Sequence, residues 1–393
     1  MVSIPNPISS PATGNFNLKY IPLWLAVVIL FSCRPLVTTF ENVESAVYYE
    51  GTSLESTDFN DTLKVMTWNI RFGAGRIPWF EDSCGDRVLM TESETIGHLE
   101  AVAAFINSEK PDILLLQEVD VSSKRSAYLD QMQWLLENTF FNYGVFASMW
   151  EAELIPQGGF GRVNVGNAIL SRWEITNAER IKLSLFTDQW VVKKYFYLRR
   201  NILKAKMNIP GLDTTLYVVN IHATAFATDD TKQKHIAKYK KVLDDLVDQD
   251  AIFITGGDFN SIPTDAEPYD FCIIDQCEDE SWHTSVEEKD YHKEGSYFDN
   301  FQAIGDYPGE RDLLQPFYAD SQNYFPAIPY EDRNSSDHFT HCTYNTSEDY
   351  RYWDRKLDYL FTNKEDGFSI GDTHQDAFYL SDHAPVSATL TFP

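Results

Sequence analysis

The run Ser381-Asp382-His383-Ala384-Pro385-Val386 lies near the C-terminus, where polar residues interrupt apolar sequence. Four upstream runs have the same character, and each stands where an apolar stretch ends: Thr67-Trp68-Asn69-Ile70, Gln117-Glu118-Val119, Asn220-Ile221-His222 and Gly257-Asp258-Phe259-Asn260. Each run offers acids, amides or imidazoles, which are the groups that a divalent metal and a phosphate need. Any one of them alone is more typical of a turn or a surface position. The ordered set indicates both where strands end and what chemistry those ends carry.

Composition narrows the classes of protein to consider. The chain has 393 residues, of which 43% are hydrophobic and 14% aromatic, so it can build a sizeable core. Its formal net charge of -27 argues against a protein that binds nucleic acid by neutralising many phosphates. A bound metal could still supply positive charge where one phosphate sits. The acidity itself is interpreted as a solvated surface.

The N-terminal region differs from the rest of the chain. After Lys19, residues 21–31 form an apolar stretch that is too short to span a bilayer and has the length of a signal-peptide core. Residues 30–33, Leu-Phe-Ser-Cys, resemble a bacterial lipobox in which Cys33 is lipidated. We therefore expect a signal peptide over residues 1–33 and a flexible tether over residues 34–62. An ordinary cleaved signal and a retained anchor remain open, and all three place the body outside the cytoplasm.

Four cysteines remain beyond Cys33, namely Cys84, Cys272, Cys277 and Cys342. In an oxidising compartment this even number allows one or two disulfides, although the sequence does not give the pairing. A zinc site is disfavoured because no second Cys or His cluster has ligand spacing.

From residue 63 onward, strand patterns alternate with helical patterns, and we expect one domain over residues 63–393. Strands are expected over residues 63–70, 113–116, 143–147, 168–170, 202–207, 216–219, 251–255, 357–361 and 386–390, and helices over residues 91–107, 126–136 and 230–246. The last helix carries Lys232, Lys234, Lys238, Lys240 and Lys241, interpreted as a solvated face. An aromatic-rich stretch with little periodicity over about residues 274–353 is expected to be an elaborated loop region.

Polar candidates occupy the ends of these strands. They lie at or near the predicted C-terminal ends, which gather at one rim of a sheet sandwich: Asn69, Glu118, His222, Asp258, Asn260, Asp358, Asp382 and His383. Carboxylate and amide oxygens suit Mg²⁺, which polarises a phosphoryl oxygen, and a carboxylate-held imidazole can handle protons. The residue types are those of metal-assisted phosphoester hydrolysis. The remaining histidines, including His338 and His341 in the loop region, are interpreted as structural.

At these residues the chain resembles the endonuclease/exonuclease/phosphatase family, which has the DNase I-like fold. The resemblance covers residues 63–390 and includes, in the family's order, the five runs above with Gly-Asn-Ala-Ile-Leu-Ser-Arg at 166–172 and Arg-Lys-Leu-Asp-Tyr-Leu-Phe at 355–361. It implies an α/β (α+β) fold, a four-layer α/β/β/α sandwich of two packed mixed β-sheets flanked by helices.

The resemblance also implies roles for individual residues. Glu118 would be the principal ligand of Mg²⁺, or of Mn²⁺, with Asn69 beside it and Asp382 as a further carboxylate. Asp258 and Asn260 would contact the nucleophilic water and the phosphate, and His222 would stabilise the phosphoryl oxygens. His383, oriented by Asp358, would be the general base or the imidazole that polarises the phosphate. Asn167 and Arg199, which match positions near the site in relatives, would contact the substrate.

The chain departs from the family's pattern in two places. The usual Asn-Thr-His-Leu is here Asn220-Ile221-His222-Ala223, and Phe226 could fill the missing apolar volume. The loop region at 274–353 is longer than in relatives, which leaves the substrate more open than the chemistry.

These observations predict an extracytoplasmic, Mg²⁺-dependent phosphoesterase, a monomer attached to a membrane by its lipid anchor, in the periplasm or at the cell surface. The expected substrate is a phosphodiester, either a lipid headgroup as in sphingomyelinases or a small molecule. A secreted nuclease acting on DNA or RNA is the alternative. A catalytically inactive surface lipoprotein is the alternative from another class, and the presence of Glu118, Asp258 and His383 argues against it.

Overall fold

Alternating apolar residues build the centre of the computed structural model. In β3 (Thr62–Asn69), Leu63 and Val65 face a core between two sheets, whereas Met66 and Trp68 face the helices on the other side. The neighbouring β4 (Ile113–Asp120) alternates in the same way. Because side chains on a strand point to opposite faces with a period of two, each sheet contributes to two apolar layers.

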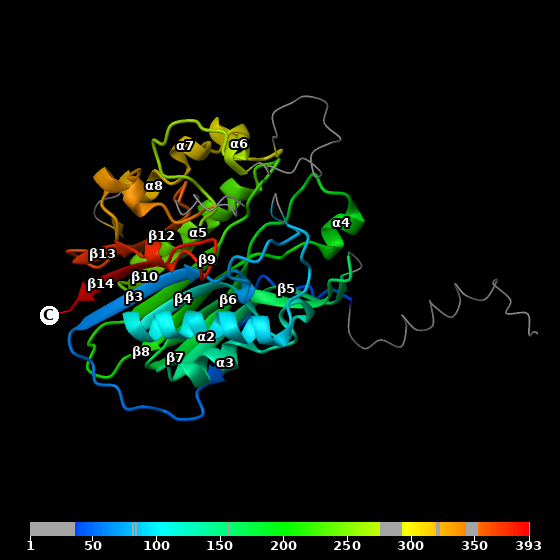
Figure 1. Cartoon of the computed structure of the whole chain (residues 1–393). Coiled ribbons are helices and arrows are strands. Elements are labelled where there is room, and N and C mark those ends of the chain that lie inside the picture. The colour runs from blue at the N-terminus through cyan, green and yellow to red at the C-terminus, as the bar shows by residue number, and fades with distance from the viewer. Residues whose placement is uncertain are drawn as a thin grey trace, which may run out of the picture. The chain divides into compact units, whose positions relative to one another are not determined.

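The structure describes residues 36–80, 82, 85–155, 158–275, 293–319, 323–342 and 353–392. In this part of the chain, one sheet has the order β13-β14-β3-β4-β6-β5-β2 and the other β1-β7-β8-β9-β10-β12-β11 (Figure 1). Their remaining strands are β1 (Val43–Ser45), β2 (Val47–Glu50), β5 (Tyr143–Ile155), β6 (Gly161–Ser171), β7 (Glu174–Lys182), β8 (Asn201–Asn208), β9 (Leu216–His222), β10 (Ile252–Asp258), β11 (Phe325–Pro326), β12 (Asp358–Thr362), β13 (Ile370–Thr373) and β14 (Val386–Thr391).

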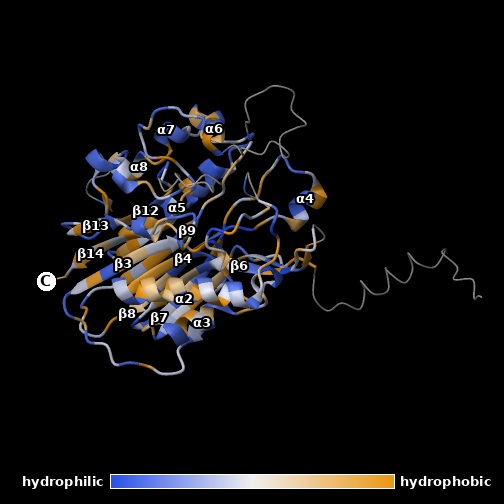
Figure 2. Cartoon of the chain, viewed as in Figure 1, coloured by the Kyte–Doolittle hydropathy of each residue, from blue (hydrophilic) through white to orange (hydrophobic). Residues whose placement is uncertain are grey.

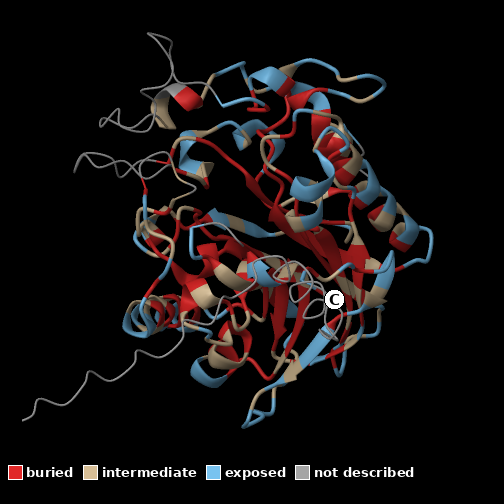
Figure 3. Ribbon diagram, turned by 90° about the vertical axis from the view of Figure 1, so that its right-hand side faces the viewer, coloured by how far each residue is buried: buried red, intermediate tan, exposed pale blue. Residues whose placement is uncertain are grey.

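Helices cover the outer face of each sheet. The α2 (Glu92–Glu109) and α3 (Gln131–Asn138) helices pack on one sheet, and α5 (Thr231–Val247), α7 (Glu310–Leu313) and α8 (Pro316–Ala319) pack on the other. Two further short helices are α4 (Val191–Phe196) and α6 (Cys272–Asp275). The central strands are buried, and exposed residues gather on the outer helices and loops (Figure 3). The expected four-layer α/β/β/α sandwich is confirmed.

The segment expected to be a tether contributes to both sheets. Within residues 34–62, β1 pairs with β7 and β2 pairs with β5 at the sheet edges. Val43 and Val47 are exposed, so these short edge strands show little apolar alternation in the sequence. This corrects the expected start of the folded body from residue 63 to Val37, where the compact unit begins.

Two other expectations are corrected. The helix expected over residues 126–136 begins only at Gln131, where the Asp130 side chain accepts from the backbone N–H of Gln133 and caps the helix. Lys232 of α5 is buried instead of solvated, and its Nζ donates to the backbone oxygen of Asn260 at 2.8 Å and pairs with Glu310.

Several expectations fall on residues outside the described ranges. These are the signal peptide over residues 1–33 with its lipidation site Cys33, and the cysteines Cys84 and Cys277. Cys272 and Cys342 are buried free thiols. Among the described helices, none has the length and apolar character needed to cross a membrane.

Candidate active site

The directions of the strands bring the candidate residues to one edge of the sheet sandwich. The parallel pairs β3–β4 and β9–β10 end there, which places Asn69 beside Gln117 and His222 beside Asp258. The strands β12 and β14 run antiparallel to β10 and β3, so they begin at this same edge of the sandwich. Asp358 is therefore the first residue of β12, paired with Asp258, and His383 lies just before β14. The expectation that every candidate lies at or near the C-terminal end of a strand is corrected for Asp358, Asp382 and His383, which lie at or before the N-terminal ends of β12 and β14.

A bulge in β4 presents Glu118. The pairing of β4 with β6 shifts between Leu116 and Val119, and Glu118 has a left-handed backbone with φ of 58°. Such a bulge redirects one side chain out of the strand's alternation. The Glu118 carboxylate receives a hydrogen bond from the Asn69 amide at 3.3 Å. Burial raises the pKa of Glu118, and the nearby Asp382 carboxylate acts in the same direction.

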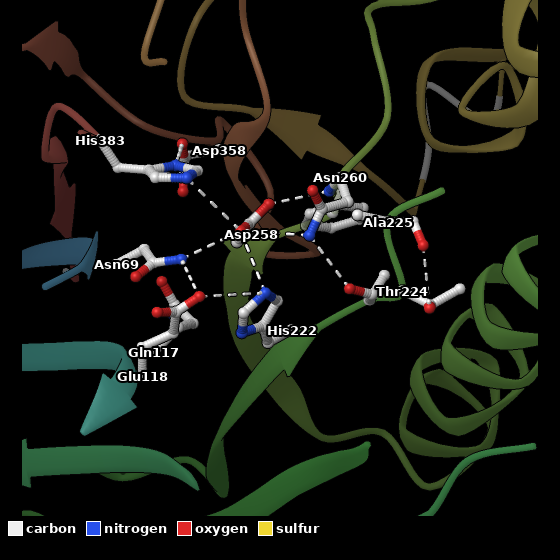
Figure 4. A network of polar contacts seen from close by, with 12 residues as sticks. Asn69, Gln117, Glu118, His222, Thr224, Ala225, Asp258, Asn260, Asp358 and His383 are labelled. Carbon is white, nitrogen blue, oxygen red and sulfur yellow. Dashed lines mark hydrogen bonds and ion pairs between the residues drawn. The ribbon is translucent and has the colours of Figure 1, made fainter. Parts of the chain in front are cut away.

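Asp258 lies at the centre of the site (Figure 4). Its Oδ2 accepts from the Asn69 amide at 3.1 Å and lies 3.2 Å from His222 Nε2. Its Oδ1 accepts from the Asn260 backbone N–H at 2.8 Å. Burial raises the pKa of Asp258 to about 7, and His383 opposes this shift. For His222, burial lowers the pKa well below its usual value, so its imidazole is neutral.

Glycine is required next to Asp258. Gly257 has φ of 138°, and a Cβ added there would lie 1.9 Å from the backbone oxygen of Ile221 on β9. The close approach of β10 to β9 sets the position of Asp258 opposite His222.

His383 is held by Asp358, as expected. Its Nδ1 lies 2.7 Å from Asp358 Oδ2, and its Nε2 lies 3.7 Å from Asp258 Oδ2. The Trp68 indole donates to the His383 backbone oxygen at 2.9 Å, which fixes the loop before β14. Burial lowers the pKa of His383, but Asp358 and Asp258 outweigh it and raise the value to about 10. His383 is therefore an imidazolium at neutral pH.

Asp382 is paired with a buried arginine that the sequence did not single out. Arg71 Nε lies 3.2 Å from Asp382 Oδ2, and Arg71 also pairs with Asp82. Although burial alone would raise the pKa of Asp382, Arg71 lowers it to about 2. His341, from the loop region, packs its ring edge-on against His383 with centroids 4.8 Å apart. Among the residues that the structure describes, two groups have ligand atoms close enough to hold a cation: His341, Asp382 and His383, and Asp258, Asp358 and His383.

A divalent metal fits these side chains. Glu118 and Asp382 both line the cavity and offer the carboxylate oxygens that a hard cation prefers. A cation beside them would relieve the repulsion that helps to raise the pKa of Glu118. Asn69 turns its NH₂ toward the carboxylates, since its Oδ1 accepts from the Arg71 backbone N–H at 3.0 Å.

The site opens into a cavity of about 1040 Å³. Glu118, His222, Asp258, Asn260, Asp382 and His383 lie along it, together with His341. Aromatic side chains form a large part of the wall: Phe72, Trp79, Phe80, Phe186, Trp190, Tyr197 and Phe226. Phe226 is thus half-buried at the cavity instead of filling the core next to Ala223.

Neither expected substrate contact lines this cavity. Asn167 is fully buried, and its amide donates to the backbone oxygen of Asn201 at 3.1 Å, between β6 and β8. Arg199 donates to the backbone oxygens of Tyr197 and Tyr195 at 2.9 and 3.0 Å. Asn167 thus joins β6 to β8, Arg199 fastens the segment that contains α4, and the neighbouring Arg200 lines the cavity instead. The assignment of Asn167 and Arg199 as substrate contacts is corrected accordingly.

Buried amides also join the two sheets beneath the site. Gln117 donates to Asn220 Oδ1 at 2.8 Å, and Asn220 donates to the backbone oxygens of Leu116 and Ala168. A buried amide must find partners, so these bonds fix the register between the sheets. The amides Gln117 and Asn220 in the Gln-Glu-Val and Asn-Ile-His runs are the sequence feature from which this network could have been predicted.

Comparisons with known proteins agree with this geometry. The model of the endonuclease/exonuclease/phosphatase family matches residues 66–383. No curated protein matches the chain. A solved endonuclease/exonuclease/phosphatase from Beutenbergia cavernae DSM 12333 is 19% identical and superimposes with a TM-score of 0.53, covering 85% of this chain and 72% of that one.

Two further structures are more distant. A family protein from Leptotrichia buccalis C-1013-b is 17% identical over 83% of this chain and 98% of that one, with a TM-score of 0.47. Truncated TDP2 from Caenorhabditis elegans is 16% identical over 84% and 98%, with a TM-score of 0.42. The family model spans both ends of the site, from β3 to His383. The chain therefore belongs to the endonuclease/exonuclease/phosphatase family of phosphoester hydrolases.

Proposed function

We propose that the protein is an extracytoplasmic, Mg²⁺-dependent phosphodiesterase in which water attacks phosphorus directly, with Mn²⁺ able to replace Mg²⁺. The observation that carries the proposal is the position of the Asp258 carboxylate. It lies within 3.7 Å of the amide of Asn69 and the imidazoles of His222 and His383. A carboxylate so placed can orient and deprotonate a water beside groups that stabilise phosphoryl oxygens.

The side chains divide the work by charge. Asp258, whose pKa is about 7, takes the proton of the attacking water, and Asn260 holds its other oxygen in place. His383, aimed by Asp358 and lying 3.7 Å from Asp258, is placed to stabilise the phosphoryl oxygens. Neutral His222 donates a hydrogen bond at the same centre. A bound Mg²⁺ would neutralise charge on the phosphate.

The charge of the cavity supports a diester over a monoester. Among the described residues, its wall carries five cationic side chains, Arg71, Lys193, Arg200, Lys293 and the imidazolium of His383. It carries six acidic ones, Asp82, Glu118, Asp188, Asp258, Glu294 and Asp382. A phosphodiester has one negative charge, whereas a phosphomonoester approaches two at neutral pH, so the diester is repelled less.

The substrate proposed is a lipid headgroup or a small diester. The second candidate is single-stranded nucleic acid, because aromatic residues of the wall could stack on bases. Attachment through a lipid on Cys33 is part of the proposal. Fractionation of bacteria that express Cys33→Ser checks it, since a variant that still partitions with membranes would contradict lipidation.

The hydrolase proposal is tested with the body of the protein, residues 37–393. It should hydrolyse bis-p-nitrophenyl phosphate with Mg²⁺ or Mn²⁺, and EDTA should abolish the activity until metal is restored. His383→Ala should lose activity by a factor of about 10² to 10⁴, the range for a group acting in the transition state. Absence of activity with any divalent metal, or full activity in His383→Ala, would contradict it. A parallel panel of sphingomyelin, plasmid DNA, RNA and an inositol phosphate ranks the substrates.

A further inference from the structure

The α4 helix exposes apolar side chains that nothing in the described part of the chain covers. Val191 is 83% exposed, Trp190 at its N-terminal end 62% and Val192 50%. No residue of α4 is buried. The helix stands apart from both sheets and carries both apolar and polar residues (Figures 1 and 2). Exposed clusters of this kind mark interaction surfaces, since single scattered apolar residues are normal but adjacent ones are not.

The surrounding chain holds α4 in place. Before the helix, the backbone N–H and the hydroxyl of Thr187 both donate to Asp229 Oδ2, at 2.7 and 2.6 Å. After it, Arg199 binds the backbone oxygens of Tyr195 and Tyr197. Phe196 packs against the buried cluster that contains Trp79 and Phe160. The exposed face is therefore presented by an anchored segment, which limits the entropy lost when a partner binds.

The same segment reaches the active site. Trp190 and Lys193 line the cavity that also contains His222 and His383. The charged residues of α4 itself are Lys193 and Lys194. A partner that rests on α4 thus lies at the mouth of the cavity, with two cations beside it. The composition, an exposed tryptophan with aliphatic residues and lysines, is that of segments that sit at the interface of a bilayer.

We infer that residues 190–195 dock on the surface of a zwitterionic phospholipid bilayer, so that a headgroup phosphodiester enters the cavity. This rests on the proposed phosphodiesterase activity and names its substrate class. Val191 and Val192 favour lipid over nucleic acid, because aliphatic side chains insert among acyl chains but do not stack on bases. The net charge of -27 favours a zwitterionic surface, since an anionic membrane would repel the body.

Vesicle binding tests the inference without relying on catalysis. The body, residues 37–393, contains both sheets and is sedimented with phosphatidylcholine vesicles at physiological salt. Val191→Asp/Val192→Asp should lower the bound fraction at least about tenfold, because insertion of one valine alone contributes roughly that factor. Both positions are exposed in the first turn of α4, where aspartate suits the helix, so folding should be retained.

Ile370→Asp is the matched control, since Ile370 is 66% exposed on β13 and does not line the cavity. It should bind vesicles like the unsubstituted body. Equal binding by the body and the double variant, or no binding by the body, overturns the inference. The inference is also overturned if the body binds a single-stranded oligonucleotide but not vesicles, and if the double substitution abolishes that binding.

Activity separates this inference from the proposed function. With sphingomyelin or phosphatidylcholine in vesicles, the double variant should lose about tenfold more activity than it loses on bis-p-nitrophenyl phosphate. Vesicle binding that depends on α4, in a body that cleaves no ester, leaves docking standing and overturns the phosphodiesterase proposal. Hydrolysis of the ester by a body that does not bind vesicles supports the phosphodiesterase proposal and overturns docking.

Discussion

The floor and the rim of the cavity are built in different ways. The floor is the set of side chains at or beside strand ends that line the cavity, namely Glu118, His222, Asp258, Asn260 and His383, together with Asn69 and Asp358, which bond to Asp258 and His383. The rim comes from the connections between strands, namely Asp188, Trp190, Lys193, Phe226 and Lys293. Floor residues contact one another at hydrogen-bond distances, whereas Trp190 and Lys193 are exposed.

This difference separates chemistry from substrate. The floor is fixed by strand register and by buried amides such as Gln117 and Asn220, so it cannot change without disturbing both sheets. The rim is fastened by a few local contacts, such as those of Thr187 and Arg199, and can vary while the sheets stay unchanged. We therefore expect the floor to determine which bond is broken and the rim to determine which molecule presents it.

The strongest test of this comparison is to replace one aspartate by asparagine in the floor and one in the rim. Asp258→Asn keeps the shape of the side chain but removes the carboxylate at the centre of the floor. We expect kcat on bis-p-nitrophenyl phosphate to fall by about 10³, the usual cost of losing a general base. Steady-state kinetics at saturating Mg²⁺ measure it.

Asp188→Asn is the matched rim substitution, since Asp188 lines the same cavity and accepts from Thr228. It should change kcat on this small ester by less than about threefold, as for a surface hydrogen bond. If both variants lose activity equally, floor and rim do not divide the function as described.

The sequence predicted the floor because its residues stand at or beside the ends of apolar strands. Apolar alternation or apolar runs placed β3, β4, β9 and β10 to within a few residues, and the polar runs that followed supplied Asn69, Glu118, His222 and Asp258. Single short edge strands such as β1 lack this signal, since one pairing to β7 holds them in place.

Other side chains escaped prediction because their surroundings come from distant parts of the chain. Lys232 has the helical spacing of a solvated face, yet Glu310, 78 residues away, buries it as an ion pair. Arg199 and Arg200 are adjacent in sequence, and only the tertiary structure distinguishes the one behind the cavity from the one that lines it. His341 reaches His383 through a pairing between the loop region and the segment before β14.

The junction between floor and rim gives a prediction on stability. His235 of α5 accepts from the Thr224 backbone N–H at 3.3 Å, just after the floor strand β9. Its other nitrogen donates to the Ser184 backbone oxygen at 2.8 Å, at the start of the rim connection. Burial lowers the pKa of His235 from 6.5 to about 4, so the neutral form is the one that joins these segments.

Because the folded pKa is below the unfolded one, protonation favours unfolding. The contribution of His235 is complete above pH 6.5 and falls as the pH drops toward 4. At pH 5 the free energy of unfolding should be about 2 kcal/mol lower than at pH 7 on this account. Urea unfolding measures this for the body and for His235→Asn, whose side chain does not titrate. The difference between their pH dependences of the free energy of unfolding gives the contribution of His235. If the free energy of unfolding of both proteins falls equally between pH 7 and pH 5, protonation of His235 does not weaken the contacts of this junction.

The smallest expected effect concerns His341, a loop residue that reaches the floor. Its ring packs edge-on against His383 and lines the cavity, whereas His338 in the same region bonds Thr373 away from it. We expect His341→Ala to lower kcat/KM on the small ester about tenfold, since it removes one contact that orients His383, and His338→Ala to leave it nearly unchanged. His341→Phe separates the causes. It keeps the edge-on packing without a nitrogen, so recovery of activity assigns His341 to positioning His383, and continued loss assigns it to binding the phosphate or a cation. If His341→Ala matches the unsubstituted body in kcat, KM and melting temperature, the loop region contributes to the rim alone.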